Sequence, residues 1–406
     1  MDVLLRPGQG PRPRVLREAP RGERARPPEH GGGAGPDHRC RPARGRHVSD
    51  LYVAAGGGGD PVGTLIAARA LGGDASGPPL VATYAWERPE VDPTAAALGG
   101  GDFEGLVHRA GAGDGFAAFT AATRVRPPAG STLPGLARDL PARLLLLDPA
   151  AGLSALARQL GAMAAAAGGR IRVVDIGGDI LTHGDEPGLC SPFTDALTLA
   201  ACHLTGIPTT VHVAGPGLDG EIEERTLLER LTGSEPLVPD RDAAAAASRA
   251  LAWHPSEASA LWAASLQGAR GTVRTVREGT VRLTDASPGL YPLPLARALD
   301  HNPVARALVE ERPATLRAAA AVSHRLTGIH GLASEPTAPS RRDRHPPVAG
   351  AASLDGDTAR KVLREAADGA DHVTLRFAVR TLGLTWVDIP ALRTVLGIGT
   401  PLLRPA

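Results

Sequence analysis

The sequence predicts an α/β fold, because short apolar runs alternate with segments of helical periodicity and several runs end in glycine-rich turns. The run Ile171–Asp175 is continuous and β-branched, which is typical of a parallel strand buried on both faces. Strands that alternate with helices in this way build a parallel sheet with two covered faces. We therefore expect a mostly parallel, Rossmann-like sheet with helices on both faces, plus a C-terminal helix–strand element.

The elements of the sheet are expected in a regular order along the chain. The predicted strands are Leu51–Ala55, Leu80–Tyr84, Leu144–Leu147, Ile171–Asp175 and Thr209–Ala214. The predicted helices are Val62–Leu71, Leu153–Ala167 and a third from Pro192 to about Leu204. Ser191 is interpreted as the N-cap of the third helix, since serine is favoured there and a proline follows it at the first helical position. Gly206 is expected to end this helix.

The pattern is weaker in the last third of the chain. We expect two helices, then a hairpin that turns at Glu278-Gly279, and finally a helix and an alternating strand after a linker rich in Pro, Ser and Arg. These elements are Ala243–Trp253, Ser256–Gln267, the hairpin Thr272–Thr284, Thr358–Ala367 and His372–Val379.

The first 47 residues differ in composition from the rest of the chain. They contain eleven Arg, five acidic residues and eight Pro, and they have no apolar periodicity. Such a segment buries too little apolar surface to offset its ordering entropy, so we expect a disordered arm, with a basic nucleic-acid-binding arm as the alternative. We expect residues 1–47 to result from a mis-called start and the protein to begin at Val48, because GTG, a valine codon, also serves as a start codon in GC-rich genomes. The domains expected after it are an α/β domain at 48–335, a linker at 336–350 and a C-terminal segment at 351–406.

Charge, cysteine content and hydropathy exclude several classes of protein. The 406 residues carry a formal net charge of +1, and because residues 1–47 contribute +6, the remainder carries −5. A mildly acidic body argues against nucleic acid as a partner. Three cysteines are too few for a disulfide framework, and no apolar run is long enough for a membrane span or a signal peptide. We expect a cytoplasmic protein with no membrane partner; the oligomeric state stays open.

Three glycine turns that follow predicted strands are the candidate ligand-binding sites. In an open parallel sheet, ligands bind outside the carboxyl ends of the strands. Glycine lets backbone amides approach an anion closely, and a following helix N-terminus favours negative charge. The alternative is that a chain with 50 glycines carries such turns without a function. The candidate ligand-binding residues are Gly56, Gly57, Gly58, Gly59, Asp60, Gly177, Gly178, Gly215, Gly217, Asp219 and Glu221.

Acidic residues gather at the same turns and are the candidate catalytic groups. Asp175 and Asp179 bracket Gly177-Gly178, and carboxylates crowded at one sheet edge need a cation, a proton or an arginine between them. We expect Asp175 and Asp179 to bind a metal ion or to exchange protons, and His183 to be a candidate general base. The structural alternatives are a dipole-stabilised helix terminus for Asp195, a turn for Asp219 and an exposed loop for His183.

Four motifs in this order resemble an uncharacterised prokaryotic protein family, which is catalogued as a domain of unknown function. The motifs are AAGGGGDPVG, VVDIGGD, SPFTDA and GPGLDGE, and the resemblance covers about residues 50–335. It implies no activity, and it supports only the start near Val48 and the choice of residues.

The function expected from these residues is that of an enzyme. Its substrate is expected to be a small anionic metabolite, phosphorylated or a nucleotide, bound together with Mg²⁺ or another divalent cation. The first alternative is a transferase or oxidoreductase whose glycine turns hold a nucleotide cofactor. The second is a non-catalytic ligand-binding or regulatory protein that uses the same pocket.

Overall fold

A nine-stranded, mostly parallel sheet forms the centre of the computed structural model, which describes residues 50–58, 60–75, 77–109, 115–277, 279–332 and 354–405. The expected arm 1–47, the linker 336–350, Gly59 and Glu278 lie outside the described residues. The described residues all belong to one compact unit, His47–Ala406.

Five parallel strands make up the middle of this sheet. The strand order is β13 (Leu290–Pro294), β10 (Thr209–Ala214), β9 (Ile171–Ile176), β1 (Leu51–Ala54), β2 (Leu80–Trp86), β8 (Arg143–Leu147), β6 (Phe116–Ala118) and β5 (Val107–Arg109). The ninth strand, β3 (Ala97–Leu98), pairs antiparallel with the end of β2. The strands from β10 to β8 are parallel, whereas β13, β6 and β5 pair antiparallel at the two edges. Counted along the chain, the parallel strands lie in the order 5-4-1-2-3, which is doubly wound, with its switch point between β1 and β9. The predicted fold class is confirmed.

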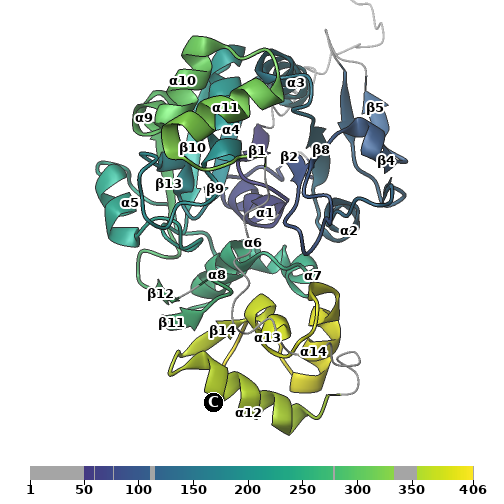
Figure 1. Ribbon diagram of the computed structural model, residues 1–406, viewed down its shortest axis with the longest axis vertical. Helices are drawn as coiled ribbons and strands as arrows, with labels where there is room; N and C mark the ends of the chain where they lie inside the picture. Colours follow the sequence, from purple (N-terminus) through teal and green to yellow (C-terminus); the bar gives the residue numbers. More distant parts are fainter. Residues whose placement is uncertain are drawn as a thin grey trace, which may run out of the picture. The chain divides into compact units, whose positions relative to one another are not determined.

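Helices cover both faces of the sheet, and each face has its own apolar core (Figure 1). One face carries α3 (Leu153–Ala167), α4 (Pro192–Thr205), α9 (Leu295–His301), α10 (Pro303–Glu311) and α11 (Leu316–Thr327). The other carries α1 (Asp60–Ala70), α2 (Leu133–Asp139), α6 (Arg241–Ala245), α7 (Ser248–Leu251) and α8 (Glu257–Leu266). Alternate residues of β1 face opposite cores, because Leu51 and Val53 pack on the first face and Tyr52 on the second.

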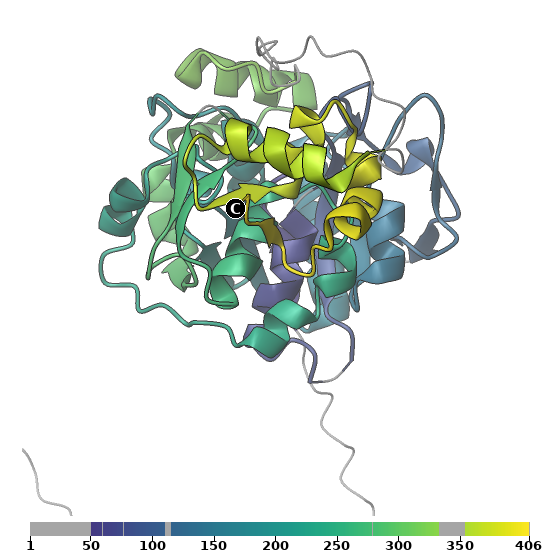
Figure 2. The same ribbon diagram turned by 90° about the horizontal axis from the view of Figure 1, so that it is seen from below.

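The hairpin predicted at Thr272–Thr284 is confirmed and is part of a second sheet. Its strands are β11 (Gly271–Arg274) and β12 (Thr280–Leu283), and the sheet order is β12-β11-β14-β15. Both β14 (His372–Thr374) and β15 (Leu402–Leu403) come from the C-terminal segment, whose helices are α12 (Gly356–Ala367), α13 (Leu375–Thr381) and α14 (Ile389–Leu396). The C-terminal segment, yellow in Figure 2, has a small core of its own and is joined to the body by strand pairing.

Short elements complete the structure. They are β3 (Ala97–Leu98), β4 (Phe103–Glu104), β7 (Arg124–Val125), α5 (Glu224–Arg230) and the 3-10 turns η1 (Gly100–Asp102), η2 (Asp179–Leu181) and η4 (Trp386–Asp388). No helix in the described ranges is long and apolar enough to cross a membrane.

Two predicted elements are wrong in part. The strand expected at His372–Val379 ends at Thr374, whose hydroxyl accepts a hydrogen bond from Phe377 N at 3.1 Å and caps α13. The helix expected at Ala243–Trp253 is broken into α6 and α7, because Ala247 N donates to the carbonyl three residues back and tightens the chain into a turn.

Candidate functional site

A pocket lies at the carboxyl ends of the central strands, where a doubly wound sheet binds ligands. It encloses about 1000 Å³ of space, including open solvent. The turn after β1 supplies Gly56, Gly57, Gly58 and Asp60, and the end of β9 with the turn after it supplies Asp175 and Asp179. The structure therefore brings the first and second predicted turns together at the switch point.

Three buried aspartates form the centre of this pocket. One carboxylate oxygen from each of Asp175, Asp179 and Asp195 lies within 4.8 Å of the others, and the exposed fractions of these residues are 1%, 7% and 2%. Asp175 Oδ2 and Asp195 Oδ1 are buried and have no hydrogen-bond partner among the described residues. Unpaired buried carboxylate oxygens are costly, so this group is incomplete without a cation or protons.

A second acidic group shares Asp179 with the first. Asp179, Asp219 and Glu221 also place one oxygen each within 4.8 Å of one another. Burial, and next the charge of Asp195, raises the pKa of Asp175 and of Asp179 well above its usual value. Burial and then the charge of Glu221 raise the pKa of Asp219 to about 7. The site thus retains protons in the absence of a cation.

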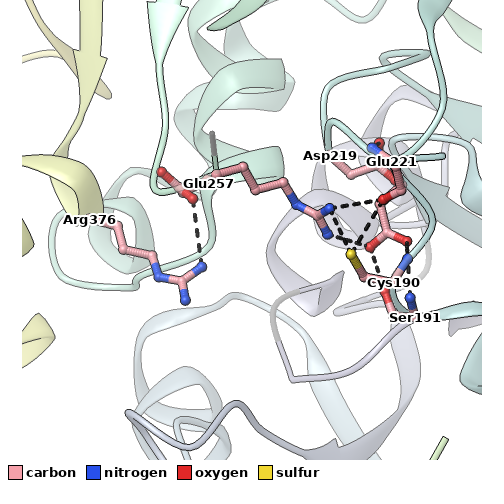
Figure 3. Close-up of polar contacts among 8 residues, drawn as sticks. Cys190, Ser191, Asp219, Glu221, Glu257 and Arg376 are labelled. Atoms are coloured by element: carbon pink, nitrogen blue, oxygen red, sulfur yellow. Dashed lines mark hydrogen bonds and ion pairs between the residues drawn. The ribbon is translucent and has the colours of Figure 1, made fainter. Parts of the chain in front are cut away.

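Glu221 is held by the protein itself. Its Oε1 accepts hydrogen bonds from Ser191 Oγ at 2.6 Å and Arg277 Nη2 at 2.7 Å, and its Oε2 accepts from the amides of Cys190 and Ser191 (Figure 3). Because four donors already bind its carboxylate, Glu221 holds the pocket wall in place and is poorly placed to bind a ligand directly. Ser191 occupies the N-cap position of α4, but the predicted capping hydrogen bond is absent because its hydroxyl bonds Glu221 instead.

Two backbone amides of the first glycine turn already donate hydrogen bonds within the protein. Gly56 N donates to Asp60 Oδ2 at 2.9 Å, and Gly58 N donates to Trp86 O at 3.1 Å. Burial, only partly offset by the Gly56 amide, raises the pKa of the half-buried Asp60 to about 7. The Asp60 carboxylate therefore fills part of the space in which an anion was expected to bind. Gly59, the remaining glycine of this prediction, is outside the described residues.

The glycines of the other two turns shape the site from outside the pocket. Gly177 has a φ of +129°, and a Cβ there would lie 2.4 Å from Asp219 Cγ, so only glycine lets that acid approach. The amides of Gly215 and Gly217 donate to the carbonyls of Gly289 and Gly177, so they are already used. Gly178 packs against Leu227, away from the lining. The predicted ligand contacts of these glycines remain predictions.

His183, the predicted general base, lies away from the described lining of the pocket. Its ring is exposed and stacks on His301, with 3.1 Å between His183 Nε2 and His301 Nδ1. Asp195, which sequence reasoning interpreted as a dipole-stabilised helix terminus, lies in the first turn of α4 and is also a member of the buried acidic group.

The family model described as "Protein of unknown function (DUF1152)" matches residues 51–338. The chain belongs to this family. The resemblance inferred from the four motifs is thereby confirmed, and the match covers the sheet and the acidic pocket but ends before the C-terminal segment. No curated protein and no solved structure matches the chain.

Within this family domain, three hydrogen-bonded residues beside the first turn were not predicted from the sequence. Glu87 Oε1 accepts from Thr132 N at 2.8 Å and Thr132 Oγ1 at 2.6 Å, and His254 Nε2 lies 3.1 Å from Thr132 Oγ1. Burial lowers the pKa of His254 to about 3, so this imidazole is neutral. Because its Nδ1 accepts a hydrogen bond from Ser256 N, its Nε2 carries the proton and donates to Thr132 Oγ1. Glu87 follows β2 directly, and its place at the end of a strand was the signal that could have predicted it.

Gly57 provides a test of why the first turn needs glycine. A Cβ at Gly57 would lie 2.5 Å from Trp86 O, a backbone atom that cannot move away. We expect Gly57→Ala to lower the free energy of unfolding by about 1–3 kcal/mol in chemical denaturation, because overpacking strains the end of β2. The matched control is Gly161→Ala, where a Cβ meets open space inside α3, and there a gain of about 0.5–1 kcal/mol is expected. Equal stabilities of the two variants would contradict this account.

Proposed function

We propose that this protein is an enzyme that uses a divalent cation, Mg²⁺ or Mn²⁺, to act on a small anionic metabolite, phosphorylated or a nucleotide. The supporting observation is the buried group of Asp175, Asp179 and Asp195, in which two carboxylate oxygens have no hydrogen-bond partner within the part of the chain that the structure describes. Mg²⁺ and Mn²⁺ are oxygen-binding cations, and a cation among these oxygens would remove both their repulsion and their unmet hydrogen bonding. In this role the three aspartates are the ligands.

A cation would let an anionic substrate approach the acidic part of this site. This part includes Asp60 and Asp219 besides the three aspartates, and in their ionised form these groups would repel a phosphate group that entered alone. A divalent cation held by the three aspartates would bind substrate oxygens directly and would polarise the substrate for attack. Asp179, which belongs to both acidic groups, is the residue that we expect to matter most for turnover.

A nucleotide-cofactor enzyme is the second candidate, and the strand order favours it. The switch point beside a glycine turn is where dinucleotides bind in such sheets. However, Asp60 occupies the Gly56 amide at the start of α1, where a pyrophosphate would otherwise bind. This contact weighs against a cofactor phosphate at that position and favours the cation-dependent enzyme.

Turnover of a metabolite panel tests the proposal. The purified chain is incubated with phosphorylated metabolites and nucleotides in EDTA, and then with Mg²⁺ or Mn²⁺. We expect consumption of one substrate class that requires the cation and falls at least 100-fold in EDTA. Turnover that depends on a nicotinamide or methyl-donor cofactor but not on a metal would favour the second candidate. Tight binding without turnover would indicate a regulatory or ligand-binding protein.

A further inference from the structure

The C-terminal segment places one buried arginine in the wall of the pocket. Arg376 lies in the first turn of α13, is only 7% exposed and lines the same pocket as the aspartates. Figure 3 shows Arg376 beside Glu257, with Asp219 and Glu221 on the other side of the view. The matched family domain ends at residue 338, so this arginine comes from a part of the chain that the family model does not cover.

Contacts from two directions fix the position of Arg376. Its Nε lies 2.6 Å from Glu90 Oε1, and its Nη1 lies 3.6 Å from Glu257 Oε2. Glu257 begins α8 and accepts hydrogen bonds from Val276 N, after β11, and from the hydroxyl of Thr374, at the end of β14. The Arg376 guanidinium is therefore preorganised, because the Glu257 carboxylate beside it joins α8 to the ends of β11 and β14.

A second arginine lines the pocket near Arg376. This residue is Arg88, whose side chain is exposed; after burial, its positive charge is the next cause that lowers the pKa of Arg376. The five N–H donors of a guanidinium match the oxygens of a phosphate, and an oxyanion between two such groups would relieve their repulsion. Arg376 and Arg88 thus place guanidinium donors, beside Glu90 and Glu257, in the wall of the pocket that also holds the three aspartates.

We propose that Arg376 binds a phosphate group of the substrate, so that the C-terminal segment completes the binding site. This inference rests on the proposed function, since it deepens what that pocket binds. The substrate class is a phosphorylated metabolite whose phosphate lies between the bound cation and Arg376. Some of its oxygens bind the cation held by Asp175, Asp179 and Asp195, while others accept hydrogen bonds from Arg376.

The test measures binding of inorganic phosphate and of Mn²⁺ by calorimetry in the full chain. We expect Arg376→Met to weaken phosphate binding about ten- to hundred-fold in saturating Mn²⁺, while the Mn²⁺ affinity stays within two-fold of the parent. Lys361→Met is the matched control, because it removes one exposed positive charge from α12 of the same segment. We expect no change in this control. Arg376→Lys should retain part of the phosphate affinity, since the charge remains without the fork of donors.

A double variant keeps the test valid if Arg376→Met leaves Glu257 uncompensated and unfolds the chain. Arg376→Gln with Glu257→Gln removes one charge of each sign, so the net charge of the pocket is unchanged. A direct contact predicts that phosphate binding is still lost at least ten-fold. Unchanged phosphate affinity in the folded variants, with or without a lower melting temperature, would overturn the proposal, as would a parent that binds Mn²⁺ but no phosphate.

The two proposals fail in different ways. If the parent binds no Mn²⁺ but phosphate binding still depends on Arg376, the metal function is wrong and the arginine site stands. If Mn²⁺ binds to the expected aspartates and the phosphate affinity does not depend on Arg376, the metal function stands and Arg376 has only a structural role.

Discussion

Replacing Asp179 with asparagine is expected to abolish both turnover and stabilisation by Mn²⁺, while the apo protein stays at least as stable as the parent. Asparagine keeps the shape of the side chain but removes the charge that a cation needs. Removing a carboxylate from a crowded buried group also relieves repulsion, because the pKa of Asp179 is raised by burial and by Asp195. At a cation concentration of 100 times Kd, the parent gains about 2.7 kcal/mol and the variant none.

The measurement is a thermal-shift titration with Mg²⁺ and Mn²⁺, beside an assay on whichever substrate the panel identifies. Asp185→Asn is the matched control, since Asp185 lies six residues away in an exposed loop. We expect this control to behave as the parent in both experiments, and we expect the Asp179 variant to lose at least 100-fold in rate. Equal cation-induced shifts in parent and Asp179 variant would remove the metal role from this residue.

Raising the pH from 6.5 to 8.5 is expected to destabilise the cation-free protein. The pKa values of Asp60 and Asp219 are about 7 in the folded chain and 3.8 in the reference state, so the folded state binds more protons in this window. The free energy of unfolding therefore falls with pH, by roughly 1 kcal/mol for each group between pH 6.5 and 8.5. Asp175, Asp179 and Asp195 add to the loss, since burial raises their pKa values as well.

The lower limit of the window keeps an opposing effect small. Burial lowers the pKa of His212 to about 4 and of His254 to about 3, so these residues increase stability with rising pH mainly below 6.5, and above it by only about 0.4 kcal/mol each. Chemical denaturation at several pH values, with EDTA or with saturating Mn²⁺, tests the prediction. In Mn²⁺ the fall should be smaller, because a cation replaces the protons. A free energy of unfolding in EDTA that is flat or rises from pH 6.5 to 8.5 would contradict the protonated acidic group.

The parts of the site that sequence reasoning predicted lie at the ends of strands. Strand periodicity located β1 and β9, and the doubly wound rule then indicated that Asp60, Asp175 and Asp179 would share one edge. The prediction needed no knowledge of side-chain contacts, because the carboxyl ends of parallel strands meet at the same edge of a sheet. The spatial order of the strands supports this prediction further, but it became known only with the pairing of β1 and β9 in the structure.

The site residues that were not predicted from the sequence depend on contacts between distant segments. Asp195 has a sufficient local explanation as an acid at a helix N-terminus, so nothing in its own segment marks it as a member of the acidic group. Arg376 reaches the pocket through the pairing of β14 with β11, about 100 residues earlier in the chain. Such a pairing depends on two short strands whose sequences match many partners. Glu221 was predicted as a ligand contact, but its partners Ser191 and Arg277 could not be inferred from spacing.

The most direct test of the central claim is anomalous diffraction from crystals of the protein grown with Mn²⁺. We expect one Mn²⁺ peak between Asp175, Asp179 and Asp195. Its ligands, at about 2.0–2.3 Å, should include Asp175 Oδ2 and Asp195 Oδ1, which have no hydrogen-bond partner among the described residues. Water or phosphate oxygens would complete the coordination. Well-ordered crystals in saturating Mn²⁺ with no anomalous peak at these aspartates, or with Mn²⁺ bound only elsewhere, would contradict the claim that this pocket is a metal centre.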